Sequence, residues 1–320
     1  MDDDFEALLN ALRDEELPLP FEDLEKLSDL NRARLTLFLG TWSRLSANRK
    51  SLLLSTLGQQ ADEKIELSFE AINRAVLSEP EADVRRIAIS NLWECEDEGL
   101  VPTYLQALDD ETSTDVRIAA AEALGRYVLL GENAKLSGET LSDIENALIS
   151  TIASDPQIGL LKASVEALGY SSRPEAVRII AEAYEAGEES LRGSALIAMG
   201  RSYSEQWKPI VMQELLSPSP VLRNEAARAA GELEMREAVG LLIDLLDDAS
   251  DEVRESAVWS LGLIGGDRAR QALLELQEAS GPEDPISQVL EDALDHIAFL
   301  DGTPDFLMFD FENDDEDDVG

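Results

Sequence analysis

The sequence predicts an all-α protein, a right-handed α-solenoid of about eight short helical pairs. The first observation is a phrase that recurs along the chain and reads Val-Arg-Glu-Ser-Ala-Val-Trp-Ser-Leu-Gly at residues 253–262. Its copies carry apolar or small residues at offsets 0, 4, 7 and 8 from the first residue, which is the period of one helix face, and most end in glycine. The second observation is spacing, because the copies at Leu191, Leu222 and Val253 begin 31 residues apart, as in solenoids built of helical pairs.

The first 30 residues are expected to form a capping segment ahead of the repeats. Residues 2–13 place four apolar side chains at helical spacing behind an acidic first turn. Two prolines within residues 15–20 then end any helix. We expect this short helix to cap the first repeat; the alternative is that it binds a partner.

The repeat array is expected to span residues 31–300. Its first pair has apolar stripes that start at Leu35 and Leu52. The later first helices are expected near 64–77, 98–108, 141–153, 174–186, 205–216, 235–247 and 267–279. Most of these first helices are expected to pair with the copy of the phrase that follows them. The last one, 267–279, is expected to pair with 285–299. A longer connection at 130–140 makes the step from Val116 to Leu160 44 residues.

Residues 301–320 have a different composition from the array. They alternate acidic and bulky apolar residues, contain no basic residue, and carry Phe306, Phe309 and Phe311. This composition predicts a disordered tail. The tail either keeps the protein soluble, docks on a partner through its phenylalanines, or folds back over the array.

The net charge of −41 limits the possible partners. Nucleic-acid binding depends on Lys and Arg that neutralise phosphates, so this charge excludes a nucleic-acid partner and equally an anionic membrane surface. Two interpretations of the acidity stay open. One is attraction of a basic protein partner, and the other is solubility in a salty cytoplasm.

The sequence predicts a cytoplasmic monomer. Cys95 is the single cysteine, so no intramolecular disulfide can form. The N-terminus is acidic, which is the wrong sign for a signal peptide. No apolar run approaches the roughly 18–20 residues that span a bilayer.

The phrase resembles the short HEAT-like repeat of phycobilin lyases and of many uncharacterised bacterial HEAT-repeat proteins. The resemblance rests on the Arg…Ala…Ala-Leu-Gly spacing and covers residues 31–300. It implies stacked HEAT-like helical pairs, and it leaves two functions open: a protein-binding scaffold, and a lyase-like enzyme or chromophore chaperone. The matching residues are structural, so no chromophore-handling residue is carried over.

Catalytic and metal-binding groupings are nearly absent from the sequence. His296 is the only histidine, whereas deoxyhypusine hydroxylase, a HEAT-like enzyme, needs several His-Glu pairs for its iron. Cys95 has no histidine nearby and is expected to be a small buried thiol. We therefore predict no catalytic residue, no cofactor and no metal.

An arginine recurs at offset 1 of the phrase. This position lies at the edge of the apolar arc and faces an adjacent repeat. We expect these arginines to pair across the stack with the acids that precede the phrase, Asp83, Asp115 and Glu252; the alternative is anion binding. The five arginines are Arg85, Arg117, Arg192, Arg223 and Arg254.

Offsets 2 and 6 lie opposite the apolar arc, on the expected concave face. Apolar side chains beside arginine are typical of protein-binding hot spots. The candidate partner-binding residues are therefore Arg86, Ile118, Ile197, Arg228 and Trp259. We expect the apolar members to be exposed, unless irregular stacking or the tail covers them. Trp93 and Trp207 are expected to pack between repeats.

These observations together predict a non-enzymatic scaffold or adaptor. It would bind another protein, preferably a basic one, along its concave face through several separate contacts.

Overall fold

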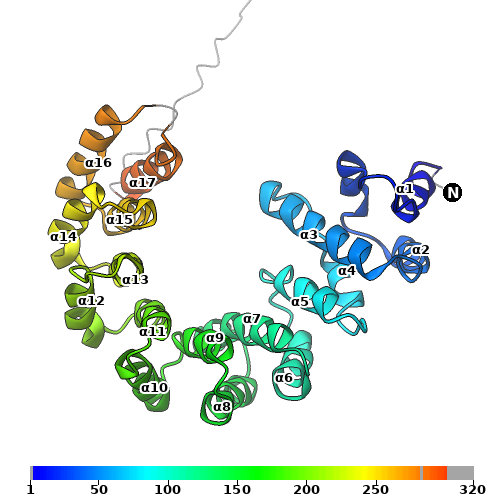
Figure 1. Ribbon diagram of the computed structural model, residues 1–320, viewed down its shortest axis with the longest axis horizontal. Coiled ribbons are helices and arrows are strands. Elements are labelled where there is room, and N and C mark those ends of the chain that lie inside the picture. The colour runs from blue at the N-terminus through cyan, green and yellow to red at the C-terminus, as the bar shows by residue number, and fades with distance from the viewer. Residues whose placement is uncertain (1–2, 282–283, 301–320) are drawn as a thin grey trace, which may run out of the picture. The chain divides into compact units, whose positions relative to one another are not determined.

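The chain is α-helical in a computed structural model that describes residues 3–281 and 284–300 (Figure 1). These residues form seventeen α-helices and no β-strand. Helix α1 (Asp3–Arg13) precedes eight pairs, which confirms the all-α solenoid of about eight pairs. The pairs are α2 (Arg32–Trp42) with α3 (Ala47–Glu63), α4 (Glu70–Ala75) with α5 (Ala82–Ser90), α6 (Val101–Asp110) with α7 (Thr114–Glu132), α8 (Gly138–Ser154) with α9 (Ile158–Leu168), α10 (Pro174–Glu185) with α11 (Glu189–Arg201), α12 (Lys208–Glu214) with α13 (Pro220–Glu232), α14 (Val239–Asp244) with α15 (Asp251–Ile264), and α16 (Asp267–Ala279) with α17 (Ser287–Leu300).

The helices belong to two compact units, residues 1–202 and residues 203–320. The sequence-based division treats residues 31–300 as one array. The phrase gives no signal for the boundary, because the 31-residue step from Leu191 to Leu222 continues across it. Unit 1 contains α1 to α11, and unit 2 contains α12 to α17.

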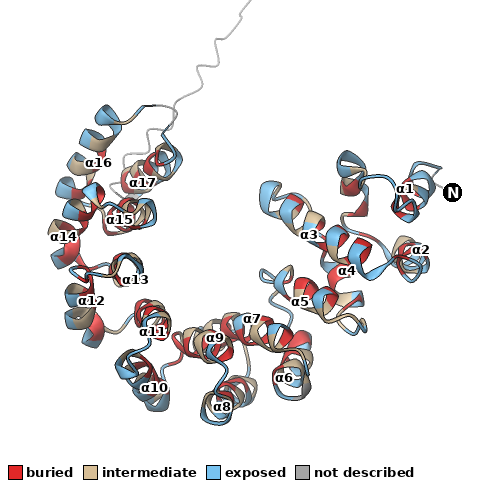
Figure 2. Cartoon of the chain, viewed as in Figure 1, coloured by how far each residue is buried: buried red, intermediate tan, exposed pale blue. Residues whose placement is uncertain are grey.

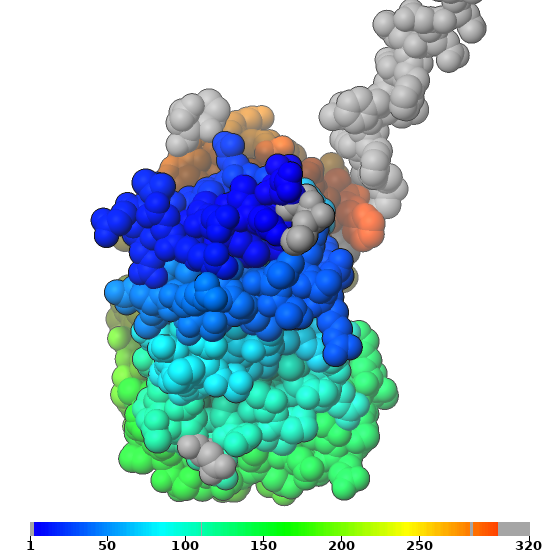
Figure 3. All heavy atoms as spheres, turned by 90° about the vertical axis from the view of Figure 1, so that its right-hand side faces the viewer, coloured from blue at the N-terminus to red at the C-terminus, as the bar shows by residue number. Residues whose placement is uncertain are grey.

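Each unit has two layers of helices. In unit 1, α6, α8 and α10 form one layer and α7, α9 and α11 form the other, and the repeats stack in sequence order (Figures 1 and 3). Buried residues concentrate where the two layers face each other (Figure 2). Within a unit, second helices also pack on one another, α5 on α7, α7 on α9 and α9 on α11 in unit 1, and α13 on α15 and α15 on α17 in unit 2.

The glycine that ends the phrase serves close packing between neighbouring second helices. Gly125 lies inside α7, which continues to Glu132. A Cβ on Gly169 would lie 2.7 Å from the Cα of Ala198 on α11, closer than two carbon atoms can approach. The absence of a side chain therefore allows neighbouring second helices to touch backbone to backbone. As a helix stop the glycine is confirmed in α9, which ends at Leu168 with Gly169 as its C-cap, and not in α7, which continues past Gly125.

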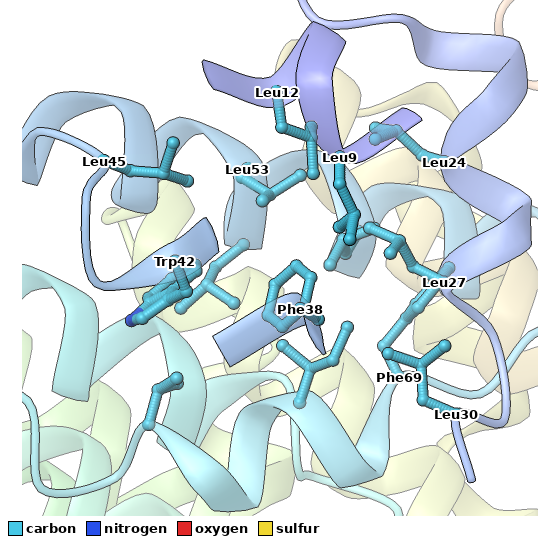
Figure 4. Close-up of a cluster of buried hydrophobic side chains, with 14 of the residues drawn as sticks. Leu9, Leu12, Leu24, Leu27, Leu30, Phe38, Trp42, Leu45, Leu53 and Phe69 are labelled. Atoms are coloured by element: carbon cyan, nitrogen blue, oxygen red, sulfur yellow. The ribbon is translucent and has the colours of Figure 1, made fainter. Parts of the chain in front are cut away.

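The first pair in the array is covered by the N-terminal residues. Leu9 and Leu12 of α1 and two leucines of the short 3-10 helix Phe21–Leu27 point into a cluster around Phe38 (Figure 4). Buried Arg49 of α3 donates hydrogen bonds to the carbonyls of Leu12, Leu17 and Asp14 at 3.2, 2.9 and 3.1 Å. These carbonyls follow the last turn of α1 or belong to it, so the arginine satisfies acceptors that the helix leaves unpaired.

The long step between the Val116 and Leu160 phrases is mostly helix. Helix α7 has 19 residues, against 13 in α11, and α8 has 17 residues, against 12 in α10. The expected connection at 130–140 is therefore shorter, because α7 runs to Glu132 and α8 starts at Gly138. These additional turns extend α7 beyond the end of its phrase.

The recurring arginines pair across the stack, but not with the acids that the sequence suggested. Their partners lie in the turn before the next second helix, five residues ahead of its phrase. Arg223 binds both carboxylate oxygens of Asp248 at 2.7 and 2.8 Å. The same relation joins Arg85 to Glu111 at 2.6 Å and Arg117 to Asp155 at 2.5 Å.

Two arginines of the set depart from this rule. Arg192 lies over the ring of Tyr184 in its own pair, and Arg254 pairs with Asp251 of its own helix. Asp83, Asp115 and Glu252 lie at helix N-termini, where their charge suits the dipole.

Candidate functional site

The five candidate partner-binding residues are divided between the two units. Arg86, Ile118 and Ile197 belong to second helices of unit 1, and Arg228 and Trp259 belong to second helices of unit 2. The apolar members are half-buried, so the expectation that they are exposed was wrong. For Ile118 the reason is Gly159 on α9, because the Cδ1 of the isoleucine fills the space where a Cβ would be, 2.8 Å from it.

Arg228 and Trp259 contact each other across neighbouring repeats of unit 2. The guanidinium carbon of Arg228 on α13 lies 5.5 Å from the centre of the Trp259 ring on α15. Such a cation–π contact covers one face of the indole while the arginine itself stays exposed. Both residues occupy offset 6 of their phrases, and the indole face that Arg228 covers is not available to a partner.

A hollow of about 480 Å³ lies on the second-helix face of unit 1. We call it the Trp93 groove. Its walls come from the end of α5 and from α7, α9 and α11. Offset 6 supplies three of its polar residues, Ser90, Glu122 and Glu166, and the extended part of α7 supplies Arg126 and Leu129.

Trp93 is the aromatic residue that the sequence misassigned. Its side chain is 57% exposed and lines this hollow, whereas Trp207 is 5% exposed and packs as expected. The sequence carries a signal for this difference. Trp93 occupies offset 9 of the Val84 phrase, the position that Gly125 and Gly169 hold in the next two copies. A tryptophan cannot fit where glycine lets two helices touch. Helix α5 accordingly ends three residues before Trp93.

Two further hollows, of about 500 and 370 Å³, meet the Trp93 groove at the same tryptophan. The larger one includes Ile65, whose side chain is fully exposed, together with Asp62 and Glu94. The exposed tryptophan and the exposed isoleucine line the same hollow, and contiguous apolar surface of this kind often marks a contact site.

The electrostatics of the Trp93 groove centre on two carboxylates. Poor hydration raises the pKa of Glu122, and the nearby carboxylate of Glu166 raises it further. Arg201 and Arg86 lower this pKa by less than the other two effects raise it. Glu166 accepts a hydrogen bond from the Ser194 hydroxyl at 2.6 Å. The two acids therefore repel each other in the protein alone.

The arginines at the groove are engaged with other groups. Arg201 donates to the backbone carbonyl of Glu166 at 3.0 Å and lies 5.3 Å from the Tyr170 ring centre. Arg126 pairs with Glu96 at 2.7 Å. These contacts fix the guanidinium groups in the wall of the groove.

No histidine or cysteine is among the described residues that line the groove. Over residues 3–281 and 284–300, no cluster of three or more histidine, cysteine, aspartate or glutamate side chains has metal-binding geometry. Cys95 is half-buried, and this burial raises the pKa of its thiol. A thiol held in its neutral form is a poor nucleophile.

Two further expectations from the sequence concern the C-terminal tail and membrane-spanning segments. Phe306, Phe309 and Phe311 lie outside them, so docking by the tail stays a prediction. None of the described helices combines the length and apolar character that crossing a membrane requires.

Comparison with known proteins identifies the repeat. The sequence pattern of the HEAT-repeat family matches residues 71–137 and 209–294, somewhat less than half of the chain. The chain therefore contains HEAT repeats, which confirms the resemblance drawn from the recurring phrase. No curated protein matches the sequence.

Three solved structures are similar over long stretches. The complex of CpcE and CpcF of phycocyanin lyase from Nostoc sp. PCC7120 has 19% identity and a TM-score of 0.47, and the match covers 72% of this chain and 95% of that one. Human deoxyhypusine hydroxylase has 20% identity and a TM-score of 0.33, with 93% and 96% covered. Importin beta has 14% identity and a TM-score of 0.40, with 92% and 51% covered.

Proposed function

Since the chain contains HEAT repeats, we propose that it is a non-enzymatic scaffold or adaptor that binds another protein through the second-helix faces of its units. The observation that carries the proposal is the Trp93 groove. It presents an exposed indole beside two carboxylates and two fixed guanidinium groups. Exposed aromatic residues ringed by polar groups are typical of protein-binding hot spots. We place this activity in the cytoplasm and expect a monomeric protein.

The proposed mechanism combines long-range attraction with separate short-range contacts. The net charge of −41 attracts a basic partner and accelerates encounter at low salt. Once bound, the partner contacts the Trp93 groove in unit 1. In unit 2 it contacts the Arg228–Trp259 pair.

A second candidate function is supported by the size and lining of the same hollow. Its volume of about 480 Å³ falls within the range of small-molecule sites, and Trp93, Tyr170 and two arginines line it. A bilin has a flat conjugated body that can stack on aromatic rings, so Trp93 and Tyr170 suit a lyase-like enzyme or a chromophore chaperone. Visible absorbance after incubation with phycocyanobilin tests this alternative, and an unchanged bilin spectrum would remove it.

The adaptor proposal is tested with a partner that has been captured from the host, identified and purified. Its affinity is measured by calorimetry for wild type and for Trp93→Ala, Ile197→Asp and Trp259→Ala. We expect Trp93→Ala to weaken binding by about tenfold, a loss of about 1.4 kcal/mol. Asp143→Asn, on the exposed side of α8, is the control. Affinities unchanged in all three variants would refute binding through these faces.

A further inference from the structure

We infer that the Trp93 groove takes a lysine or arginine side chain of the partner between Glu122 and Glu166, with an adjacent apolar residue of the partner packed on Trp93. This inference rests on the proposed function and specifies the chemistry of the segment that is bound. The occupant is therefore a basic segment with an apolar anchor.

Glu122 is a carboxylate of the groove without a hydrogen-bonded partner in the described part of the chain. Within the described residues, Glu122 makes no hydrogen bond or ion pair, although its side chain faces Glu166 across the α7–α9 contact. One carboxylate oxygen of Glu166 accepts a hydrogen bond from the Ser194 hydroxyl at 2.6 Å. A cation placed between the carboxylates removes their mutual repulsion and gains a charge-assisted hydrogen bond from each.

The arginines at the groove have other partners. Arg201 is held by the Glu166 carbonyl and by the Tyr170 ring, and Arg126 is held by Glu96. Arg201 and Arg86 lower the pKa of Glu122 by less than burial and Glu166 together raise it. A cation supplied by the partner completes the charge balance.

The exposed apolar surface of the groove lies between acidic side chains. Trp93 lies where three hollows meet, and Ile65 is fully exposed in one of them. Acids border this apolar surface on both sides, with Asp62 and Glu94 on one side and Glu122 on the other. This order of groups matches a segment in which basic residues flank an apolar one.

An acidic segment fits the groove poorly. It would meet Glu122 and Glu166 directly, on a chain whose net charge is −41. Like charges that face each other across an interface oppose binding. Charge complementarity therefore favours a basic occupant.

The test uses the full chain and two synthetic fluorescent peptides. One has two central leucines flanked by lysines, and the other has glutamates in place of the lysines. We expect the lysine peptide to bind and the glutamate peptide not to bind, as measured by fluorescence anisotropy. Trp93→Ala and the double variant Glu122→Gln/Glu166→Gln should each weaken binding by roughly tenfold, and Trp93→Phe should retain most of it.

The matched control is Asp143→Asn/Glu185→Gln, which removes the same charge from exposed positions on α8 and α10. We expect it to change the affinity by less than about twofold, because salt largely screens exposed charges that lie more than a Debye length, about 10 Å, from the bound peptide. Circular dichroism confirms that each variant is folded. Equal weakening in the groove variant and the control would overturn the inference, since net charge alone would then explain binding.

The natural partner separates this inference from the proposed function. If the partner loses affinity with Trp93→Ala but not with Glu122→Gln/Glu166→Gln, the adaptor proposal stands and the basic subsite is refuted. If neither substitution weakens the affinity for the partner, unit 1 does not bind it through this groove. The adaptor proposal is then refuted for unit 1, and so is the basic subsite.

Discussion

The Cα of Gly169 lies against Ala198 of the next repeat so closely that a Cβ on the glycine would be 2.7 Å from the Cα of the alanine. The same relation recurs in unit 2, where a Cβ on Gly231 would lie 3.0 Å from the Cα of Ser260. Backbone at so short a distance cannot move aside without shifting a whole helix. The glycine at offset 9 therefore sets the distance between neighbouring second helices.

Gly169→Ala should lower stability, because the added methyl group forces α9 and α11 apart. Overpacking of this kind costs about 1–3 kcal/mol, and thermal unfolding measures it. Gly40→Ala is the matched control. Nothing lies within 4 Å of a Cβ on Gly40, which is inside α2, so this change should stabilise the protein by about 0.5–1 kcal/mol. Equal effects of the two substitutions would contradict the packing role.

Asp248→Asn should destabilise unit 2, because it leaves the guanidinium of Arg223 without its carboxylate partner. The pair is mostly buried, and loss of one member of a buried pair costs about 3 kcal/mol. The measurement is urea unfolding of wild type and variant at neutral pH.

The effect of this substitution should depend on pH. The hydrogen bonds from Arg223 hold the pKa of Asp248 below its ordinary value. A depressed carboxyl pKa contributes stability above the pKa of the unfolded chain, and that stability is lost as pH falls through the folded pKa. The difference between wild type and Asp248→Asn should therefore shrink on acidification. A constant difference down to the acid transition would argue against the ion pair.

Arg49→Met should release the N-terminal residues from the first pair. The methionine keeps the apolar stem of the arginine but donates no hydrogen bond to the carbonyls of Leu12, Asp14 and Leu17. We expect a loss of about 3 kcal/mol and faster proteolysis within residues 14–20. Arg44→Met, at an exposed position, is the control and should behave as wild type. Protection of residues 14–20 in both variants would disprove the role of Arg49.

Trp93→Phe should remove most of the tryptophan fluorescence that acrylamide quenches. Trp42 and Trp207 are 1% and 5% exposed, and Trp259 lies under Arg228, so Trp93 is the most accessible of the four indoles. Stern–Volmer analysis of wild type and variant measures the difference. Quenching that is unchanged in the variant would mean that Trp93 is packed in solution.

The sequence predicts the paired helices well, because apolar periodicity depends on local order along the chain. Helices α11, α13 and α15 begin within a few residues of Leu191, Leu222 and Val253, where the three regular copies of the phrase begin. The arginine partners could not be assigned in the same way. Glu111 and Asp248 lie in turns, and which turn meets which arginine depends on the register between repeats.

The binding face was predicted less completely than the fold. A helical wheel places Ile118 and Trp259 opposite the apolar arc but does not show that Gly159 or Arg228 from a neighbouring repeat covers them. Trp93 was interpreted as a packing residue because it follows the phrase. The sequence feature that marks the groove is tryptophan in place of glycine at offset 9 of the Val84 phrase.

The central claim is that the partner binds on the second-helix face of unit 1, and hydrogen–deuterium exchange of the protein with and without the purified partner tests it most directly. The account predicts that bound partner slows exchange at the end of α5 and in α7 and α9, around Trp93, Glu122 and Glu166. Slower exchange confined to α6, α8 and α10 would contradict it.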